Sequence, residues 1–374
     1  MFSSFVYVYK TLVHWLILVM KYNIIQKKHG AKVKIMRNST IRDIATYAGV
    51  SVATVSRVIN KMDNVSDETA KRVQDAIEAL DYYPNRAARE LKNQTTKTIA
   101  FIIADSTNEY YSQIAKAVLD VVRSYGYTLF LCNCFNDSEI EKNYLTMLCE
   151  RKIDGIILNS CGKNDDLVTQ LSHKIPIILI HRQIANARFV GDFVNVDFGA
   201  ATYEMTTEFI NNGHRKIGII SGPLFLSSAR ERFDNFCLAM KQIGVNVDSE
   251  YPYLQEGGHD SEFGYSAAKQ LLSMEDPPTA IVCGHNETCI GLLRYCREQH
   301  IDIPGQLSIC APCNVNTADL FYVNPAVALP DTRGLGVRIG KMLMERILSE
   351  NPIKNREVLF MPTVLPGNAL KQVD

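Results

Sequence analysis

The sequence lacks the short motifs that mark common catalytic and nucleotide-binding sites. It has no G-x-S-x-G nucleophile elbow, no H-E-x-x-H zinc motif and no Walker phosphate loop. Gly334, Gly336 and Gly340 have the wrong spacing for a dinucleotide-binding fingerprint and follow no predicted strand. These absences argue against an enzyme, so we expect no catalytic residue, no cofactor and no resident metal.

The sequence also lacks an apolar run that would easily cross a bilayer. Residues 5–20 are mostly apolar, but Lys10 and His14 interrupt them, and a span needs about 18 or more apolar residues. A secretory leader carries positive charge before its apolar run, whereas here the lysines follow it. We therefore expect translation to begin at Met36 and residues 1–39 to be an extension outside the fold. A membrane tether is the alternative.

Overall net charge is absent as well, because 40 Lys/Arg balance 40 Asp/Glu. The charge is unevenly distributed: residues 1–97 hold 16 Lys/Arg and 8 Asp/Glu, which leaves the remainder acidic. A basic segment joined to an acidic body indicates a module for a polyanion. The ten cysteines have irregular spacing in a chain of 374 residues, which is typical of reduced cytosolic thiols and of two or three domains.

A pair of short amphipathic helices is predicted from residue 40 onward. Thr40 can cap the first helix, with Asp43 completing a capping box. Gly49 can adopt the left-handed conformation of a tight turn, and Ser51 can cap the second helix. A third helix is predicted from Ser66.

The outer face of the second helix carries small and apolar side chains together with one arginine. Val52, Ala53 and Arg57 would make a poor solvent face and a good major-groove face. Helix, glycine turn and helix within about twenty residues is the helix-turn-helix arrangement. Residues 40–83 are therefore predicted to be a DNA-binding head.

The amino-acid sequence of the predicted head resembles that of a known family. Residues 40–60 read TIRDIATYAGVSVATVSRVIN, and VSDETAKRVQDAIEALDYYPNRAARELKNQTT follows after a short gap. This closely resembles the LacI/GalR family of bacterial transcriptional regulators, and the similarity continues more loosely to about residue 365. The resemblance implies a homodimeric repressor in the cytoplasm, associated with the nucleoid. It also implies a palindromic operator in double-stranded DNA as the partner, with no stable membrane partner.

The resemblance places DNA contacts at named positions. Base contacts in the major groove fall on Val52, Ala53 and Arg57, of which Arg57 has the donor fork for guanine. Phosphate contacts fall on four polar side chains, Ser51, Thr54, Ser56 and Asn60. Residues 84–97 match the family's hinge helix and linker, with Leu91 as a wedge in the minor groove. The other hinge positions assigned to DNA are Asn85, Arg86 and Ala88.

Residues 98–374 alternate β-rich runs with helical stretches. Continuous apolar strands separated by amphipathic helices predict parallel sheets covered on both faces, here in two lobes. The expected fold is thus α/β, with a small all-α head and a two-lobed body that the resemblance makes similar to periplasmic binding proteins. The N-lobe should comprise roughly residues 98–194 plus a late segment. The predicted strands are 98–104, 128–133, 155–159, 176–181, 216–221, 280–284 and 307–310.

The resemblance implies that a small-molecule effector binds between the lobes. Arg232 falls on the arginine that in the family grips a sugar hydroxyl or carboxylate. Histidines and a cysteine replace several carboxylate, amide and aromatic groups of the relatives, so an anionic or nucleoside-like effector is favoured, with a sugar-derived compound still open. The six positions assigned to the effector are Tyr111, His181, Arg232, His259, His285 and Cys313.

Other interpretations remain open from the sequence. Three histidines and a cysteine in one cleft suit zinc or redox sensing, and Cys310 and Cys313 form a C-x-x-C pair. A pocket without any effector is another alternative. A solute-binding protein would share the body fold but not residues 40–93, which argue against it. The C-terminus lacks a leucine heptad, so a dimer is expected and not a tetramer.

Overall fold

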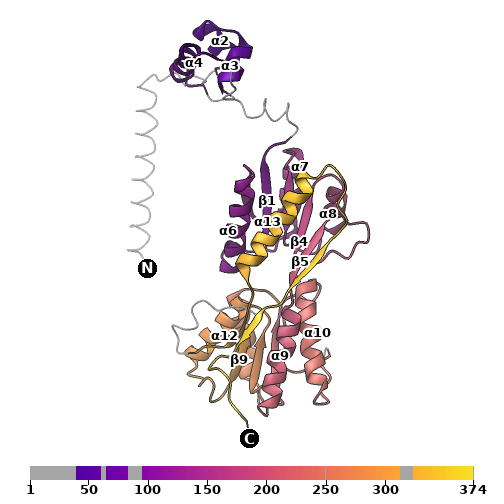
Figure 1. Ribbon diagram of the computed structural model, residues 1–374. Coiled ribbons are helices and arrows are strands. Elements are labelled where there is room, and N and C mark those ends of the chain that lie inside the picture. The colour runs from indigo at the N-terminus through magenta and orange to yellow at the C-terminus, as the bar shows by residue number, and fades with distance from the viewer. Residues whose placement is uncertain (1–38, 60–64, 83–94, 249, 312–322, 374) are drawn as a thin grey trace, which may run out of the picture. The chain divides into compact units, whose positions relative to one another are not determined.

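The computed structural model describes residues 39–59, 65–82, 95–248, 250–311 and 323–373 (Figure 1). The chain divides into two units, residues 1–92 and 93–374, which we call the head and the body. Among the described residues, no helix combines the length and apolarity that a bilayer span requires. Several predicted features lie outside the described residues: the extension up to residue 38, Asn60, Asn85, Arg86, Ala88, Leu91 and Cys313.

The described part of the head consists of three short helices whose ends are fixed by local hydrogen bonds. Thr40 and Asp43 form the expected capping box. Gly49 ends the first helix with a φ of 64°, a conformation that a side chain would strain. The Ser51 hydroxyl accepts a hydrogen bond from the Thr54 N–H at 3.1 Å and so caps the second helix. The helices are α2 (Ile41–Ala48), α3 (Val52–Ile59) and α4 (Asp67–Ala79).

A small apolar core joins these helices. Ile44, Val55 and Val73, one from each helix, are fully buried against one another. The Arg72 Nη2 donates a hydrogen bond to the Ala48 carbonyl at 2.5 Å, which ties α4 to the end of α2. The core leaves the opposite side of α3 open.

The N-lobe of the body is a six-stranded parallel sheet with the order β11-β5-β4-β3-β1-β2. Its strands are β1 (Thr98–Ile103), β2 (Thr128–Asn133), β3 (Gly155–Leu158), β4 (Ile177–Ile180), β5 (Asp192–Val196) and β11 (Glu357–Phe360). Its helices are α6 (Glu109–Ser124), α7 (Ser138–Glu150), α8 (Asp165–Ser172) and α13 (Thr332–Leu348).

The C-lobe repeats this layered architecture with the order β12-β10-β9-β8-β6-β7, in which only the β10–β12 pairing is antiparallel. Its strands are β6 (Ile217–Ser221), β7 (Leu254–Glu256), β8 (Ala280–Cys283), β9 (Ser308–Ala311), β10 (Ala326–Leu329) and β12 (Thr363–Leu365). Its helices are α9 (Phe198–Asn211), α10 (Ser227–Lys241), α11 (Ser261–Leu272) and α12 (Asn286–Glu298).

The predicted α/β fold is confirmed, and each of the seven predicted strands corresponds to an observed one. Strands β5, β7, β10, β11 and β12 were not predicted. The sequence of β5, DFVNV, contains two polar residues, and β11 alternates exposed and half-buried positions. Strand β5 therefore lacks the unbroken apolar run by which the other strands were recognised, whereas β11 has a short run but no buried position.

The elements that the structure describes pass from one lobe to the other three times, between β5 and α9, between β10 and α13, and between β11 and β12. Helix α13 therefore returns to the N-lobe, where it lies along α6 (Figure 1). Gly336 permits this close approach, because a Cβ there would lie 2.6 Å from both the Ile114 carbonyl oxygen and the Ala117 Cβ.

A buried ion pair fastens the returning segment to the N-lobe sheet. The Asp192 carboxylate is fully buried and accepts hydrogen bonds from Arg346 at 2.5 Å and from Arg356 at 2.7 Å. Burial acts to raise the pKa of Asp192, but the hydrogen bonds from the two guanidinium groups outweigh it and hold the pKa below its usual value. The carboxylate is thus ionised and links β5 to α13.

The start of the body is anchored in a similar way. Asp154, just before β3, accepts hydrogen bonds from the Thr95 hydroxyl at 2.5 Å and from the backbone N–H groups of Thr96 and Lys97 at 3.0 and 2.9 Å. The last residues of the predicted linker are therefore part of the N-lobe.

Candidate DNA-binding helix and effector pocket

In the head, α3 exposes the side chains that the sequence assigns to base contacts. Val55 is its one buried residue, and Val52 is 41% exposed. Ala53 and Arg57 are also exposed, and they lie one helical turn apart on the same side. The structure thus places these three side chains on one accessible face of the helix.

The side chains assigned to phosphate contacts surround this face. Ser51 is exposed, while Thr54 and Ser56 are half-buried. The Ser51 hydroxyl lies 2.9 Å from the Thr54 hydroxyl, at the N-terminus of α3. That helix end carries partial positive charge from its free N–H groups and favours an anion such as phosphate.

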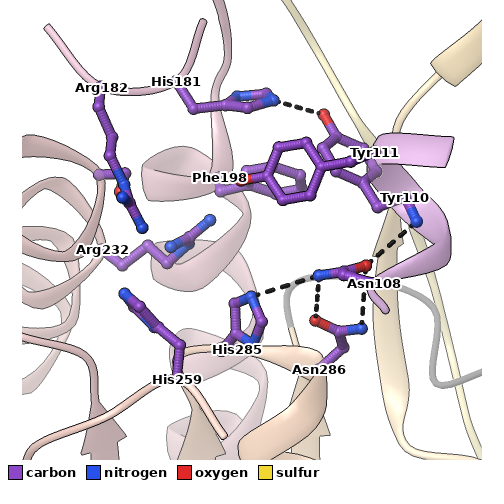
Figure 2. Close-up of a pocket in the computed structure, with 11 residues that line it drawn as sticks. Asn108, Tyr110, Tyr111, His181, Arg182, Phe198, Arg232, His259, His285 and Asn286 are labelled. Atoms are coloured by element: carbon purple, nitrogen blue, oxygen red, sulfur yellow. Dashed lines mark hydrogen bonds between the residues drawn. The ribbon is translucent and has the colours of Figure 1, made fainter. Parts of the chain in front are cut away.

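In the body, a pocket lies between the two lobes (Figure 2). It brings together five of the six positions assigned to the effector, and Cys313 lies outside the described residues. The lining residues are Asn108, Tyr110, Tyr111, His181, Arg182, Phe198, Ser228, Arg232, His259, His285 and Asn286.

Aromatic rings from the N-lobe and from the start of α9 form one side of the pocket. The Tyr110 hydroxyl lies 2.8 Å from His181 Nε2, and the Tyr111 hydroxyl donates to the buried Asn159 Oδ1 at 3.2 Å. The ring of Phe198 packs near both Tyr110 and His181, with centroids 6.4 and 6.2 Å away. A flat ligand would find aromatic faces here.

The lobes are joined across the pocket by a pair of amides. Asn108, which caps α6, donates to the Asn286 Oδ1 at 3.2 Å, and its Nδ2 lies 3.5 Å from His285 Nε2. His285 also caps α12 through its Nδ1, which accepts from the Glu287 N–H at 3.3 Å. These contacts hold the two lobes together at one side of the pocket (Figure 2).

The charged side chains of the pocket are all basic. Arg182 donates to the Ser160 carbonyl and to Asn136 Oδ1, both at 2.9 Å, and is only 5% exposed. The Arg232 guanidinium lies over the Phe198 ring, 4.9 Å from its centroid. No aspartate or glutamate is among the described residues that line the pocket.

The three pocket histidines are held neutral. Burial, together with the charges of Arg232 and Arg182, lowers the pKa of His181 and of His285 to about 3. Burial and the neighbouring His285 also lower the pKa of His259. Neither ring nitrogen of His259 has a hydrogen-bond partner among the described residues, and both nitrogens are buried.

These histidines do not assemble as metal ligands in the part of the chain that the structure describes. The one group there with suitable ligand spacing is Cys134, Glu141 and Cys161, at a different place in the N-lobe. Of the predicted C-x-x-C pair, Cys310 is buried in β9.

Six lining residues were missed from the sequence. Three of them are sequence neighbours of predicted positions, and this adjacency is the signal that could have identified them. They are Tyr110, Arg182 and Asn286. The other three carry no such signal: Asn108, Phe198 and Ser228.

Comparison with known proteins agrees with this division into head and body. Residues 40–85 match the model for bacterial regulatory proteins of the lacI family, and residues 96–361 match the model for periplasmic binding proteins and the sugar-binding domain of the LacI family. The chain belongs to the LacI family. It is a DNA-binding transcriptional regulator controlled by a small-molecule effector, which confirms the class of function predicted from the sequence.

Similar curated proteins carry the same assignment. The HTH-type transcriptional repressor PurR of Mannheimia succiniciproducens is 33% identical over 339 residues, which cover 90% of this chain and 99% of that protein. The PurR of Pasteurella multocida is 34% identical over 83% of this chain and 92% of its own length.

Solved structures show the same fold at lower identity. The Lac repressor dimer bound to operator and the anti-inducer ONPF is 20% identical, with a TM-score of 0.72 over 90% of this chain and all of that one. The regulator CelR in complex with cellobiose is 22% identical, with a TM-score of 0.66 over 89% of this chain and all of that one.

Proposed function

We propose that the chain is a transcriptional repressor that reads an operator with α3 and responds to an anionic small molecule held between the lobes of its body. The observation that carries the DNA assignment is the exposed side of α3 with Val52, Ala53 and Arg57. In this proposal Arg57 donates to guanine, and the two small apolar side chains contact base edges such as a thymine methyl. We propose no catalytic activity and no cofactor.

The remaining DNA contacts follow from the sequence resemblance. Ser51, Thr54, Ser56 and Asn60 bind phosphates and fix the register of the head. The hinge, residues 84–97, supplies the minor-groove contacts, with Leu91 inserted between base pairs. The same scheme assigns Asn85, Arg86 and Ala88 to the hinge contacts.

An anionic effector is supported by the charge of the pocket. Arg182 and Arg232 provide two cations, the three histidines are neutral, and the described lining residues include no carboxylate. A carboxylate or phosphate between the guanidinium groups would gain charge-assisted hydrogen bonds in a site largely shielded from water. The aromatic faces of Tyr110 and Phe198 favour a flat group on the rest of the ligand.

We further propose a homodimer in the cytoplasm, where an operator is accessible. Strand β2 is at the edge of the N-lobe sheet and exposes Phe130 and Leu131 by 51% and 47%. Leu119 of the adjoining α6 is 38% exposed. Exposed apolar side chains on an edge strand are costly for a monomer, and a second copy would cover them.

The DNA proposal is tested by selecting bound sequences from a random duplex pool with the full chain at moderate salt. We expect a palindromic sequence, with Arg57→Ala losing preference at one base pair of each half-site. Lys71→Ala is the matched control, because Lys71 is exposed on α4 and its loss removes the same charge. Recovery of random sequence only would refute the proposal.

The effector proposal is tested by calorimetry with matched anionic and neutral ligands. The pairs are benzoate against benzyl alcohol, adenosine monophosphate against adenosine, and glycerol phosphate against glycerol. We expect heat from anionic members only, abolished by Arg232→Ala and retained in Arg230→Ala, since Arg230 is exposed on the same helix. Equal binding of the neutral members would contradict an anion site.

A further inference from the structure

Two cysteine thiols meet inside the N-lobe, away from the pocket walls. Cys134 follows β2 and Cys161 follows β3, and their sulfur atoms lie 3.4 Å apart. Both are buried, with exposures of 0% and 4%. Strand β1 lies between β2 and β3 and ends at Ile103. The Ile103 carbonyl accepts hydrogen bonds from the N–H and from the thiol of Cys134, at 2.9 and 3.1 Å.

A buried carboxylate holds the loop of the second thiol in place. Glu141 of α7 accepts a hydrogen bond from the Cys161 N–H at 2.6 Å and another from Asn164 Nδ2 at 2.9 Å. Its side chain is fully buried. The backbone at Cys161 is therefore fixed with its sulfur facing that of Cys134.

The surroundings make one of the two thiols the more acidic. The hydrogen bond from Cys161 lowers the pKa of Cys134 despite its burial, and the Asn136 N–H and the Arg182 charge act in the same direction. The same hydrogen bond and burial raise the pKa of Cys161. Cys134 is therefore the more acidic of the two thiols, and Cys161 holds its proton more strongly, a pairing that suits thiol oxidation.

Arg182 connects this thiol pair to the pocket. Its Nη1 donates to the carbonyl of Ser160, the residue before Cys161, and its Nη2 donates to Asn136, two residues after Cys134. The same guanidinium lines the pocket (Figure 2). Any movement that draws the two cysteine loops together therefore displaces the acceptors of Arg182.

We propose that Cys134 and Cys161 are a modification site that forms a reversible disulfide, and that this bond shifts Arg182 at the effector pocket. The oxidant is a peroxide. The Cys134 thiol first gives up the proton that it donates to the Ile103 carbonyl. Its sulfur then attacks one oxygen of hydrogen peroxide and releases hydroxide, and the Cys161 sulfur, losing its own proton, displaces the second hydroxide from the sulfenic acid. The two thiol protons and the two hydroxides leave as two waters, so one S–S bond replaces two S–H bonds and one O–O bond.

The geometry requires a modest movement. A disulfide has its sulfur atoms about 2.05 Å apart, so the observed separation must shorten by about 1.4 Å. Left-handed backbone at Phe135 and Asn136, with φ of 53° and 55°, marks the first loop as an irregular turn outside the strand.

A bound metal ion fits the same atoms less well. Both oxygens of Glu141 already accept N–H hydrogen bonds, and the Ile103 carbonyl faces the Cys134 sulfur at 3.1 Å. A zinc site would keep two thiolates permanently next to that carbonyl oxygen, whereas the disulfide, once formed, carries no charge.

The disulfide is tested on the full-length protein by mild treatment with hydrogen peroxide, alkylation of the remaining thiols and peptide mass mapping. We expect Cys134 linked to Cys161, with the bond absent in Cys134→Ser and Cys161→Ser. Cys132→Ser is the matched control, because Cys132 is a buried cysteine in β2, two residues before Cys134, and its loss should leave the bond unchanged. Survival of both thiols under peroxide that oxidises the more accessible Cys149 would overturn the proposal. So would stoichiometric Zn²⁺ binding that needs both thiols and occurs in place of a disulfide.

The coupling to Arg182 is tested by hydrogen exchange with and without the disulfide. We expect altered exchange in residues 134–138, 159–163 and 181–183 of the wild type after peroxide, and none in Cys161→Ser. The effect on ligand rests on the proposed anion site: we expect benzoate or adenosine monophosphate affinity to change by about fivefold or more. Altered exchange without anion binding would refute the proposed anion site and leave the disulfide and its coupling to Arg182 standing. Unaltered exchange and unaltered affinity in the oxidised protein would refute the coupling between the disulfide and Arg182.

Discussion

Acidification should destabilise the body through its buried histidines, and two asparagine substitutions should remove the effect. His181 has a left-handed backbone, with a φ of 59°, that asparagine tolerates, and His285 caps α12, a role in which asparagine is among the best residues. The double variant His181→Asn/His285→Asn therefore keeps the local structure and loses two titrating groups.

The magnitude follows from the two protonation equilibria. Each histidine has a pKa of about 3 in the folded body and 6.5 as the ordinary value. Between these values the unfolded chain binds a proton that the folded chain does not, so stability is lost as pH falls below 6.5. From pH 7.5 to 5.5 the loss is about 1.4 kcal/mol for each histidine, or about 3 kcal/mol for both.

The assay is urea unfolding followed by far-UV circular dichroism at the two pH values. Circular dichroism is used because the one tryptophan, Trp15, lies outside the described residues. The head from residue 40 to 83 contains no histidine, so it adds no histidine titration to the measurement. Other titrating groups are common to both proteins, so the comparison isolates the two substituted side chains. An equal loss of stability in wild type and double variant would refute the conclusion that these histidines are buried and neutral.

Other substitutions test the remaining structural assignments. Arg57→Ala should weaken operator binding by about 1–3 kcal/mol, and an equal loss on random duplex in a competition assay would mean that the side chain contacts only phosphate. Asp192→Asn should cost about 3–5 kcal/mol in urea unfolding, because Arg346 would lose its buried charge partner; a loss below 1 kcal/mol would argue against that pair. Thr40→Ala should lower the free energy of unfolding of the head by about 1 kcal/mol, and no change would show that the cap is dispensable. Gly336→Ala should cost about 1–3 kcal/mol in thermal unfolding, whereas an unchanged midpoint would show that α6 and α13 can separate freely.

The sequence predicted the fold wherever burial is uniform along an element. Strands β1, β3 and β4 are buried almost throughout, so their apolar runs were recognisable. Strand β5 begins with Asp192, whose charge is tolerated only because two arginines from the end of the chain reach it. Such a partnership depends on tertiary structure and leaves no local pattern.

The pocket was predictable only in part for a similar reason. Successive residues on a strand point to opposite sides, so His181 and Arg182 would not be expected in one site. The left-handed backbone at His181 breaks that alternation, and both side chains line the pocket. Cys134 and Cys161 are 27 positions apart in the sequence and meet because parallel strands end at the same edge of a sheet.

The interleaved path of the chain has a practical consequence for genetics. Each lobe is assembled from separate stretches, since α13 and β11 complete the N-lobe after most of the C-lobe has been made. No single stop codon can yield one whole lobe, and synthesis must pass residue 360 before the N-lobe sheet has all its strands and residue 365 before the C-lobe sheet does. Truncation alleles that end before residue 357 should therefore behave as complete losses of ligand response, whatever portion of the gene they retain.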